Sequence, residues 1–115
     1  MSITIYHNPK CSKSWETLNL IAGQGAAVNI IEYLKNPPTA KKLKAILFLL
    51  NISPHELIRK KEDEYNELGL SNSALSDDDL ISFMVNHPIL IERPIVLANG
   101  KAVLGRPPKN VLNIL

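Results

Sequence analysis

The stretch that decides the fold is ITIYHNPKCSKSWETL, residues 3–18. Isoleucines alternate with polar residues up to Tyr6, which is typical of a short β-strand, and an Asn-Pro turn follows at once. A helix is then predicted from Cys11 to about Gln24, because apolar residues recur at helical spacing and two glycines end the pattern. The expected apolar face of this helix consists of Trp15, Leu18 and Ala22.

The single cysteine of the chain, Cys11, is predicted to lie where this helix begins. Helix N-termini offer free backbone N–H donors and a partial positive charge, both of which stabilise a thiolate. Cysteines in such places have pKa values of roughly 3.5–7.5 instead of about 8.5. Free cysteines are also among the most buried residues, but polar residues flank Cys11 on both sides. This position favours a nucleophilic thiolate over a structural cysteine.

A second strand is predicted over Val28–Leu34, where β-favouring residues run up to an Asn-Pro-Pro turn. Strand, helix and strand in this order imply a right-handed parallel βαβ unit. Near the end of the chain, Ile95–Leu104 contains Asn99-Gly100 between two apolar runs, which predicts a hairpin with a type I′ turn. The Pro-Pro pair that follows is expected to open a last helix.

The middle of the chain is predicted to be helical. Thr39 can cap a helix, and Ser76 with Asp79 resembles the capping box of another. The outer pieces alone, βαβ and then ββα, match the thioredoxin-like (glutaredoxin-like) α/β layout with a four-stranded mixed sheet. We therefore predict a single thioredoxin-like domain over residues 1–115, with a helical insertion at about 39–87.

The bulk composition limits the classes of function. A hydrophobic content of 45% and a charged content of 21% are ordinary for a globular protein, and a net charge of +2 is too small to predict nucleic-acid binding. Apolar runs are far too short for a membrane span, and one cysteine allows no internal disulfide. We expect a cytoplasmic protein with neither nucleic acid nor membrane as a partner.

The spacing Cys11-x-x-Ser14 puts a hydroxyl where a Cys-x-x-Cys pair has its second thiol. An oxidised or adducted Cys11 must therefore be released by an external thiol such as glutathione or a redoxin protein. Ser14 has two possible roles: its hydroxyl can donate a hydrogen bond to the thiolate, or it can cap the first turn of the helix.

The chain has only three arginines, Arg59, Arg93 and Arg106. Arg93 and Arg106 each precede a proline at a predicted strand boundary, where loops of such sheets form sites. A guanidinium suits tetrahedral oxyanions because it is permanently charged and forms bidentate hydrogen bonds. Taken singly, each arginine is also compatible with an ordinary surface position.

His7 lies four residues before Cys11. It is placed to tune the thiolate or donate to it, although a histidine in a turn that ends a strand is more often only solvated or capping. The sequence contains no cluster with metal-ligand spacing, no glycine-rich phosphate loop and no serine–histidine–acid arrangement. We predict neither a bound metal nor a bound cofactor.

Several segments together resemble the arsenate reductase family of the glutathione- and glutaredoxin-coupled type, and most closely its short bacterial members. The similarity runs in register along almost the whole chain. The matching segments are YHNPKCSKS (6–14), YLKNPP (33–38), LIRK (57–60), HPILIERPIV (87–96) and GRPP (105–108).

This resemblance implies a thioredoxin-like fold with a helical insertion and reduction of arsenate to arsenite. It implies that Cys11 attacks arsenate, that the family's histidine near the cysteine is His7, and that glutathione is the reductant and glutaredoxin the partner. With Ser14, which the spacing alone makes a candidate, the predicted catalytic residues are Cys11, His7 and Ser14. The oxyanion-binding arginines of the family match the three that this chain has: Arg59, Arg93 and Arg106. It further implies a cis peptide bond before Pro94.

At one position this chain departs from the family pattern, since Trp15 stands where close relatives carry arginine. Two other functions stay open. One is a regulator that binds RNA polymerase, like the Spx-type proteins that share this fold, although their Cys-x-x-Cys switch is absent here. The other is a monothiol oxidoreductase that acts on glutathionylated substrates.

Overall fold

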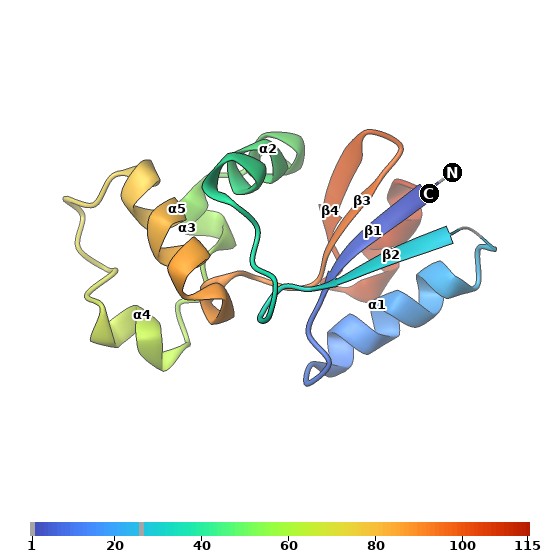
Figure 1. Ribbon diagram of the computed structural model, residues 1–115, viewed down its shortest axis with the longest axis horizontal. Coiled ribbons are helices and arrows are strands. Elements are labelled where there is room, and N and C mark those ends of the chain that lie inside the picture. The colour runs from blue at the N-terminus through green and yellow to red at the C-terminus, as the bar shows by residue number, and fades with distance from the viewer. Residues whose placement is uncertain (1, 26) are drawn as a thin grey trace. The chain divides into compact units, whose positions relative to one another are not determined.

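The computed structural model describes residues 2–25 and 27–115 (Figure 1). The chain divides into two compact units. The first, here called the sheet unit, consists of Met1–Asn36 and Arg93–Leu115, and the second, the helical unit, of Pro37–Glu92. The prediction of a single domain with an insertion at 39–87 stays a prediction, but the helices predicted in that range all fall within the helical unit.

The sheet unit contains four strands in the order β2-β1-β3-β4. β1 pairs in parallel with β2, and β3 pairs antiparallel with both β1 and β4. This confirms the predicted four-stranded mixed sheet and its βαβ piece, and the last helix follows the β3–β4 hairpin as predicted but is a 3₁₀ helix (Figure 1). The bounds of its elements are β1 Ser2–His7, α1 Ser12–Ala22, β2 Ala27–Glu32, β3 Ile95–Ala98, β4 Lys101–Leu104 and the 3₁₀ helix η2 Pro108–Asn113.

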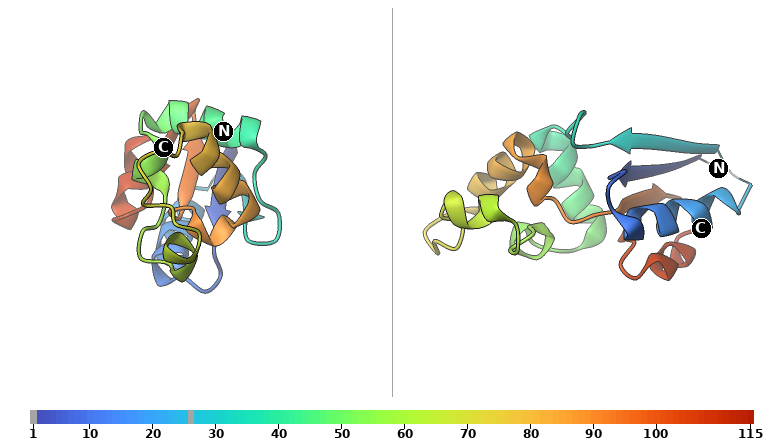
Figure 2. Two further views of the ribbon diagram at one scale, coloured as in Figure 1. Left: turned by 90° about the vertical axis from the view of Figure 1, so that its left-hand side faces the viewer. Right: turned by 90° about the horizontal axis from the view of Figure 1, so that it is seen from below.

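The core of the sheet unit lies between the two central strands and the helices α1 and η2. Figure 2 (right) shows both helices on one side of the strands. Side chains that alternate along β1 and β3 point to this side, as the two-residue period of a strand requires. The buried members of this core are Ile3, Ile5, Ile21, Val96, Ala98, Val111 and Ile114.

The buried face of α1 differs from the predicted one. Ser14, Thr17 and Ile21 are buried, whereas Trp15 is 47% exposed. The prediction holds for Leu18, which packs against the core, and was wrong for Trp15 and Ala22, which are exposed, because it assumed that apolar residues mark the buried face. Here two hydroxyl side chains are buried instead, and each has hydrogen-bond partners that make burial inexpensive.

The β3–β4 hairpin turns at Asn99 and Gly100, whose φ angles are 54° and 71°. Two consecutive positive φ angles are the signature of the predicted type I′ turn, which is therefore confirmed. The peptide bond between Arg93 and Pro94 is cis, also as predicted. A second cis bond, between Arg106 and Pro107, was not predicted.

The helical unit begins its helices where the capping signals predicted. The Thr39 hydroxyl accepts a hydrogen bond from the Lys42 N–H at 3.1 Å, and Ser76 and Asp79 form a complete capping box at 3.1 and 2.9 Å. The short helix α4, which buries no side chain, was not predicted. The elements of this unit are α2 Ala40–Leu50, α3 Pro54–Leu57, α4 Asp63–Glu67, α5 Asp77–Asn86 and the 3₁₀ helix η1 Pro88–Leu90.

A short antiparallel bridge joins Ile58 to Ile91 and ties the end of α3 to the segment after η1. The Arg59 N–H donates to the Leu90 carbonyl at 2.7 Å, and the Glu92 N–H donates to the Leu57 carbonyl at 2.9 Å. This bridge holds the backbones of Arg59 and Glu92 close together. In the part of the chain that the structure describes, no helix is long and apolar enough to cross a membrane.

Candidate active site

The loop between β1 and α1 is folded tightly around Asn8. The Cys11 N–H donates to the Asn8 carbonyl at 3.0 Å, and the Asn8 side-chain oxygen accepts from the Lys10 N–H at 3.0 Å. The Asn-Pro pair thus forms the predicted turn. Cys11 follows it as the N-cap residue of α1, and its backbone is extended, with φ −110° and ψ 120°. The thiol is partly exposed at this position.

The pKa of Cys11 results from opposing effects. Burial raises it, but the backbone N–H of Ser14, the hydrogen bond and positive charge of Arg93, and the backbone N–H of Lys13 together outweigh burial and hold the pKa below its ordinary value. Both amides belong to the first turn of α1, where backbone N–H groups have no partner within the helix and stabilise a negative charge. The site therefore favours the thiolate, the form that attacks electrophiles.

Ser14 supports this loop from the buried face of α1. Its hydroxyl accepts a hydrogen bond from the Asn8 N–H at 3.1 Å and lies 2.5 Å from Nδ1 of His7. Ser14 is fully buried, and it acts on Cys11 through its backbone amide while its hydroxyl holds the loop. Ser14 thus connects the start of α1 with the end of β1 at His7 and with the turn residue Asn8.

His7 ends β1 with only 2% of its surface exposed. Burial lowers its pKa, and the carboxylate of Glu32, its parallel partner on β2, opposes that shift only in part. The imidazole is therefore neutral at physiological pH. Besides Ser14, its ring contacts Trp15 edge-to-face, with centroids 4.6 Å apart and planes at 83°. A neutral ring in this place shapes the loop without adding charge beside the thiolate.

Arg93 is the arginine that the structure brings to Cys11, since it gives the thiol both a hydrogen bond and its charge. Arg106 lies just beyond the end of β4, exposed to solvent. Both arginines precede a cis proline in the sheet unit. Arg93 and Cys11 form an anion-favouring pair, because a guanidinium beside a thiolate reduces the repulsion that an incoming anion would meet.

Gly105 connects α1 with the two segments that contain Arg93 and Arg106. Its N–H donates to the Pro94 carbonyl at 2.9 Å, and its own carbonyl accepts from the Thr17 hydroxyl at 3.2 Å. A Cβ on Gly105 would lie 2.6 Å from Thr17 Oγ1 and 2.8 Å from Pro94 Cγ. Only glycine allows this close approach, which fixes the start of β3 and the end of β4 against the cysteine helix.

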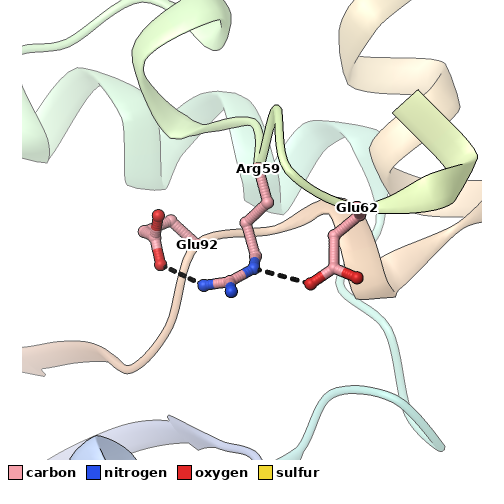
Figure 3. Close-up of polar contacts among 3 residues, drawn as sticks. All are labelled: Arg59, Glu62 and Glu92. Carbon is pink, nitrogen blue, oxygen red and sulfur yellow. Dashed lines mark hydrogen bonds and ion pairs between the residues drawn. The ribbon is translucent and has the colours of Figure 1, made fainter. Parts of the chain in front are cut away.

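Arg59, in the helical unit, is held by two carboxylates (Figure 3). Its Nε donates to Glu62 at 3.0 Å, and its Nη1 donates to Glu92 at 2.6 Å. The Arg59 side chain is only 18% exposed, so these are partly desolvated pairs rather than loose surface contacts. We call this group the Arg59 clamp.

Sequence reasoning missed four of these residues. Thr17 and Gly105 carried no signal of their own, because their importance lies in a close contact between segments far apart in the chain. Glu62 is three residues after Arg59 and could have been found as a helical-spacing ion pair, whereas Glu92 could not. Among residues 2–25 and 27–115, no group of three or more metal-binding side chains occurs.

Fold and site together define the class: a thioredoxin-like protein with one acidified cysteine at the start of its first helix. The chain belongs to the ArsC family, whose family model matches residues 6–114. This match covers the sheet unit and the helical unit alike.

Relatives and solved structures agree with this membership. The chain is 52% identical to an uncharacterised Escherichia coli (strain K12) protein, YfgD, over 98% of this chain and 96% of that protein. It is 46% identical to an arsenate reductase of Neisseria meningitidis (strain MC58), over 98% and 97% of the two chains. The solved structure of an arsenate reductase from Vibrio cholerae superposes with a TM-score of 0.97 at 52% identity, covering 100% of this chain and 98% of that one.

Proposed function

We propose that this protein is an arsenate reductase that uses Cys11 as its nucleophile and external thiols as its reductant. The observation that carries the proposal is the position of Cys11 at the N-cap of α1, in contact with Arg93. Relatives that are named arsenate reductases, 46% identical over nearly the whole of both chains, give the substrate class.

The reaction follows from the chemistry of one thiolate. Cys11 Sγ attacks the arsenic atom, a sulfur–arsenic bond forms, and a protonated oxygen leaves as water. Glutathione then attacks this adduct. Arsenic takes up two electrons and becomes arsenite, while the two sulfurs give up those electrons and end as a disulfide between Cys11 and glutathione. Thiol exchange with glutaredoxin restores the Cys11 thiol.

The proposed roles of the side chains differ in their support. Arg93 binds the oxyanion next to the sulfur, and its contact with Cys11 supports this role. For Arg106 the support is the family resemblance and its place one residue after Gly105. For Arg59, the same role requires the oxyanion to replace a carboxylate of the Arg59 clamp. His7 and Ser14 keep the cysteine loop in shape.

Further parts of the proposal concern the setting of the enzyme. We assign it glutathione as reductant, glutaredoxin as partner and the cytoplasm as location, because its only cysteine cannot resolve its own adduct and needs a reducing compartment. We also propose that residues 1–115 act as one thioredoxin-like domain whose helical insertion carries Arg59. The chemistry described needs no metal and no prosthetic group.

The test is a reconstituted assay with the protein, arsenate, glutathione and glutaredoxin, in which arsenite is separated from arsenate and quantified. We expect arsenite to form with the wild-type protein and not with Cys11→Ser. Leu20→Ala, a change on the solvent side of α1, is the control and should retain full activity. Equal arsenite with and without Cys11 would refute the proposal. Deglutathionylation of a model substrate without arsenate reduction would instead favour a monothiol oxidoreductase.

A further inference from the structure

Trp15, the only tryptophan of the chain, contacts the cysteine loop in two ways. Its indole Nε1–H donates to the Pro9 carbonyl at 2.7 Å, and its ring packs edge-to-face with His7. Nearly half of the side chain is nevertheless exposed, so it is not a core residue. Core packing therefore does not explain why this large, half-exposed side chain makes two specific contacts.

Both contacts bridge the strand-to-helix turn. His7 ends β1, Pro9 lies inside the turn, and Trp15 is on the first turns of α1. Proline offers a carbonyl but no N–H to its surroundings, so the indole satisfies the one backbone group through which Pro9 can be held. On the buried side, the Ser14 hydroxyl forms hydrogen bonds with His7 and Asn8 of the same turn. The loop is thus fixed from two sides by consecutive residues.

We propose that Trp15 is a positioning residue for Cys11: it holds the Pro9 carbonyl, covers His7 from water and so keeps the cysteine loop in the geometry that activates the thiol. Trp15 does not touch the sulfur itself. It acts through a loop in which Cys11 follows Pro9 by two residues, so movement of the Pro9 peptide changes where the sulfur lies relative to the amides of Lys13 and Ser14.

The contact of the Trp15 ring with His7 also affects the pKa of His7. The groups that face this imidazole are Ser14 and Trp15 from α1 and the carboxylate of Glu32 from β2. Burial lowers the His7 pKa, whereas Glu32 raises it. If the indole is removed, water reaches the ring, burial weakens and the carboxylate prevails, so the pKa of His7 rises. A charged imidazolium would then stand in the loop at mildly acidic pH.

The experiment compares wild type with Trp15→Phe, Trp15→Ala and the control Leu20→Ala, another exposed apolar residue of α1. Two quantities are measured against pH: the imidazole NMR shifts of His7 and the rate of Cys11 alkylation by iodoacetamide. Neither readout uses arsenate, so failure of the proposed reductase activity would leave this test intact.

We expect Trp15→Ala to raise the His7 midpoint and to slow Cys11 alkylation at neutral pH by about two- to tenfold, the range that corresponds to one hydrogen bond. Trp15→Phe retains a ring over His7 but loses the N–H donor. It should therefore leave the His7 midpoint near the wild-type value and slow alkylation by the smaller part of that range. Leu20→Ala should match wild type in both measurements. Unchanged His7 and Cys11 titrations in folded Trp15→Ala would overturn the proposal.

The wild-type protein provides a second measurement that needs no Trp15 variant. A protonated imidazole in ring contact quenches indole fluorescence, and Trp15 is the only indole present. Its emission should therefore fall with the same midpoint as the NMR titration of His7, and His7→Gln should abolish that transition. Emission that does not follow His7 protonation would refute the contact on which the proposal rests, even if Trp15→Ala failed to fold.

Discussion

Replacing Gly105 by alanine tests the close contact of Gly105 with Thr17 and Pro94, which positions the segments that carry Arg93 and Arg106. The new Cβ would lie 2.6 Å from Thr17 Oγ1, 2.9 Å from Thr17 Cγ2 and 2.8 Å from Pro94 Cγ. Ordinary van der Waals contact begins at about 3.4 Å, so three neighbours must move, and overpacking of this kind costs about 1–3 kcal/mol. Their movement also strains the contact of the Thr17 hydroxyl with the Gly105 carbonyl at 3.2 Å. That hydroxyl has one proton and also donates to the Lys13 carbonyl at 2.8 Å, so the Gly105 contact adds at most about 1 kcal/mol.

We therefore expect Gly105→Ala to lower the free energy of unfolding by about 1–4 kcal/mol. For a chain of 115 residues, 1 kcal/mol corresponds to roughly 4 °C, so the Tm should fall by about 4–16 °C. The assay is thermal and urea unfolding followed by circular dichroism. Because the displaced segments carry Arg93, the pKa of Cys11 should rise as well, which alkylation at several pH values would detect.

Gly23→Ala is the matched control, because its Cβ would meet nothing closer than 3.6 Å and its φ of −69° suits alanine. It should leave the Tm unchanged or raise it slightly. In a Thr17→Ala background two of the three close contacts vanish, so Gly105→Ala should then cost less than half as much. Equal costs in both backgrounds, or a cost no greater than that of Gly23→Ala, would refute the steric argument.

Two further predictions concern the arginines. Glu92→Gln removes one negative charge from the Arg59 clamp, so an oxyanion meets less competition for Arg59. Under the proposed function, the KM for arsenate in the reconstituted assay should fall about two- to fivefold. An unchanged or higher KM would argue against Arg59 as an oxyanion ligand. Arg93→Gln removes a hydrogen bond and a charge that lower the Cys11 pKa; since only the thiolate reacts, the midpoint of the alkylation–pH profile should move to higher pH and the rate at neutral pH should fall. Arg106→Gln is the control for this shift, and equal profiles for Arg93→Gln and wild type would contradict the assigned cause.

Much of the fold could be predicted from the sequence because its signals are local. Asn99-Gly100 specifies a tight turn by the backbone angles that these two residues tolerate. Thr39 and Ser76 cap helices through bonds that span only three residues. The position of Cys11 at an N-cap follows in the same way from the Asn-Pro turn before it.

The errors arose where distant segments meet. The predicted buried face of α1 was wrong at Trp15 and Ala22, because Ser14 and Thr17 are buried through partners outside the helix, at His7 and Gly105, which no helical pattern reveals. The second carboxylate of the Arg59 clamp comes from 33 residues further along the chain. The roles of the site residues remain predictions that the assays above address.

The place of β1 in the sheet also has a consequence for biosynthesis. β1 is a central strand, yet one of its two neighbours, β3, begins only at Ile95, after the whole helical unit has been made. Until then, β1 has an open edge and its buried isoleucines lack the strand that later pairs beside them. The helical unit is a compact unit with its own buried residues and its own caps. We therefore expect it to fold first on the ribosome and to shorten the loop that β3 must close. Chains that stop before residue 93 should therefore aggregate rather than accumulate as folded fragments.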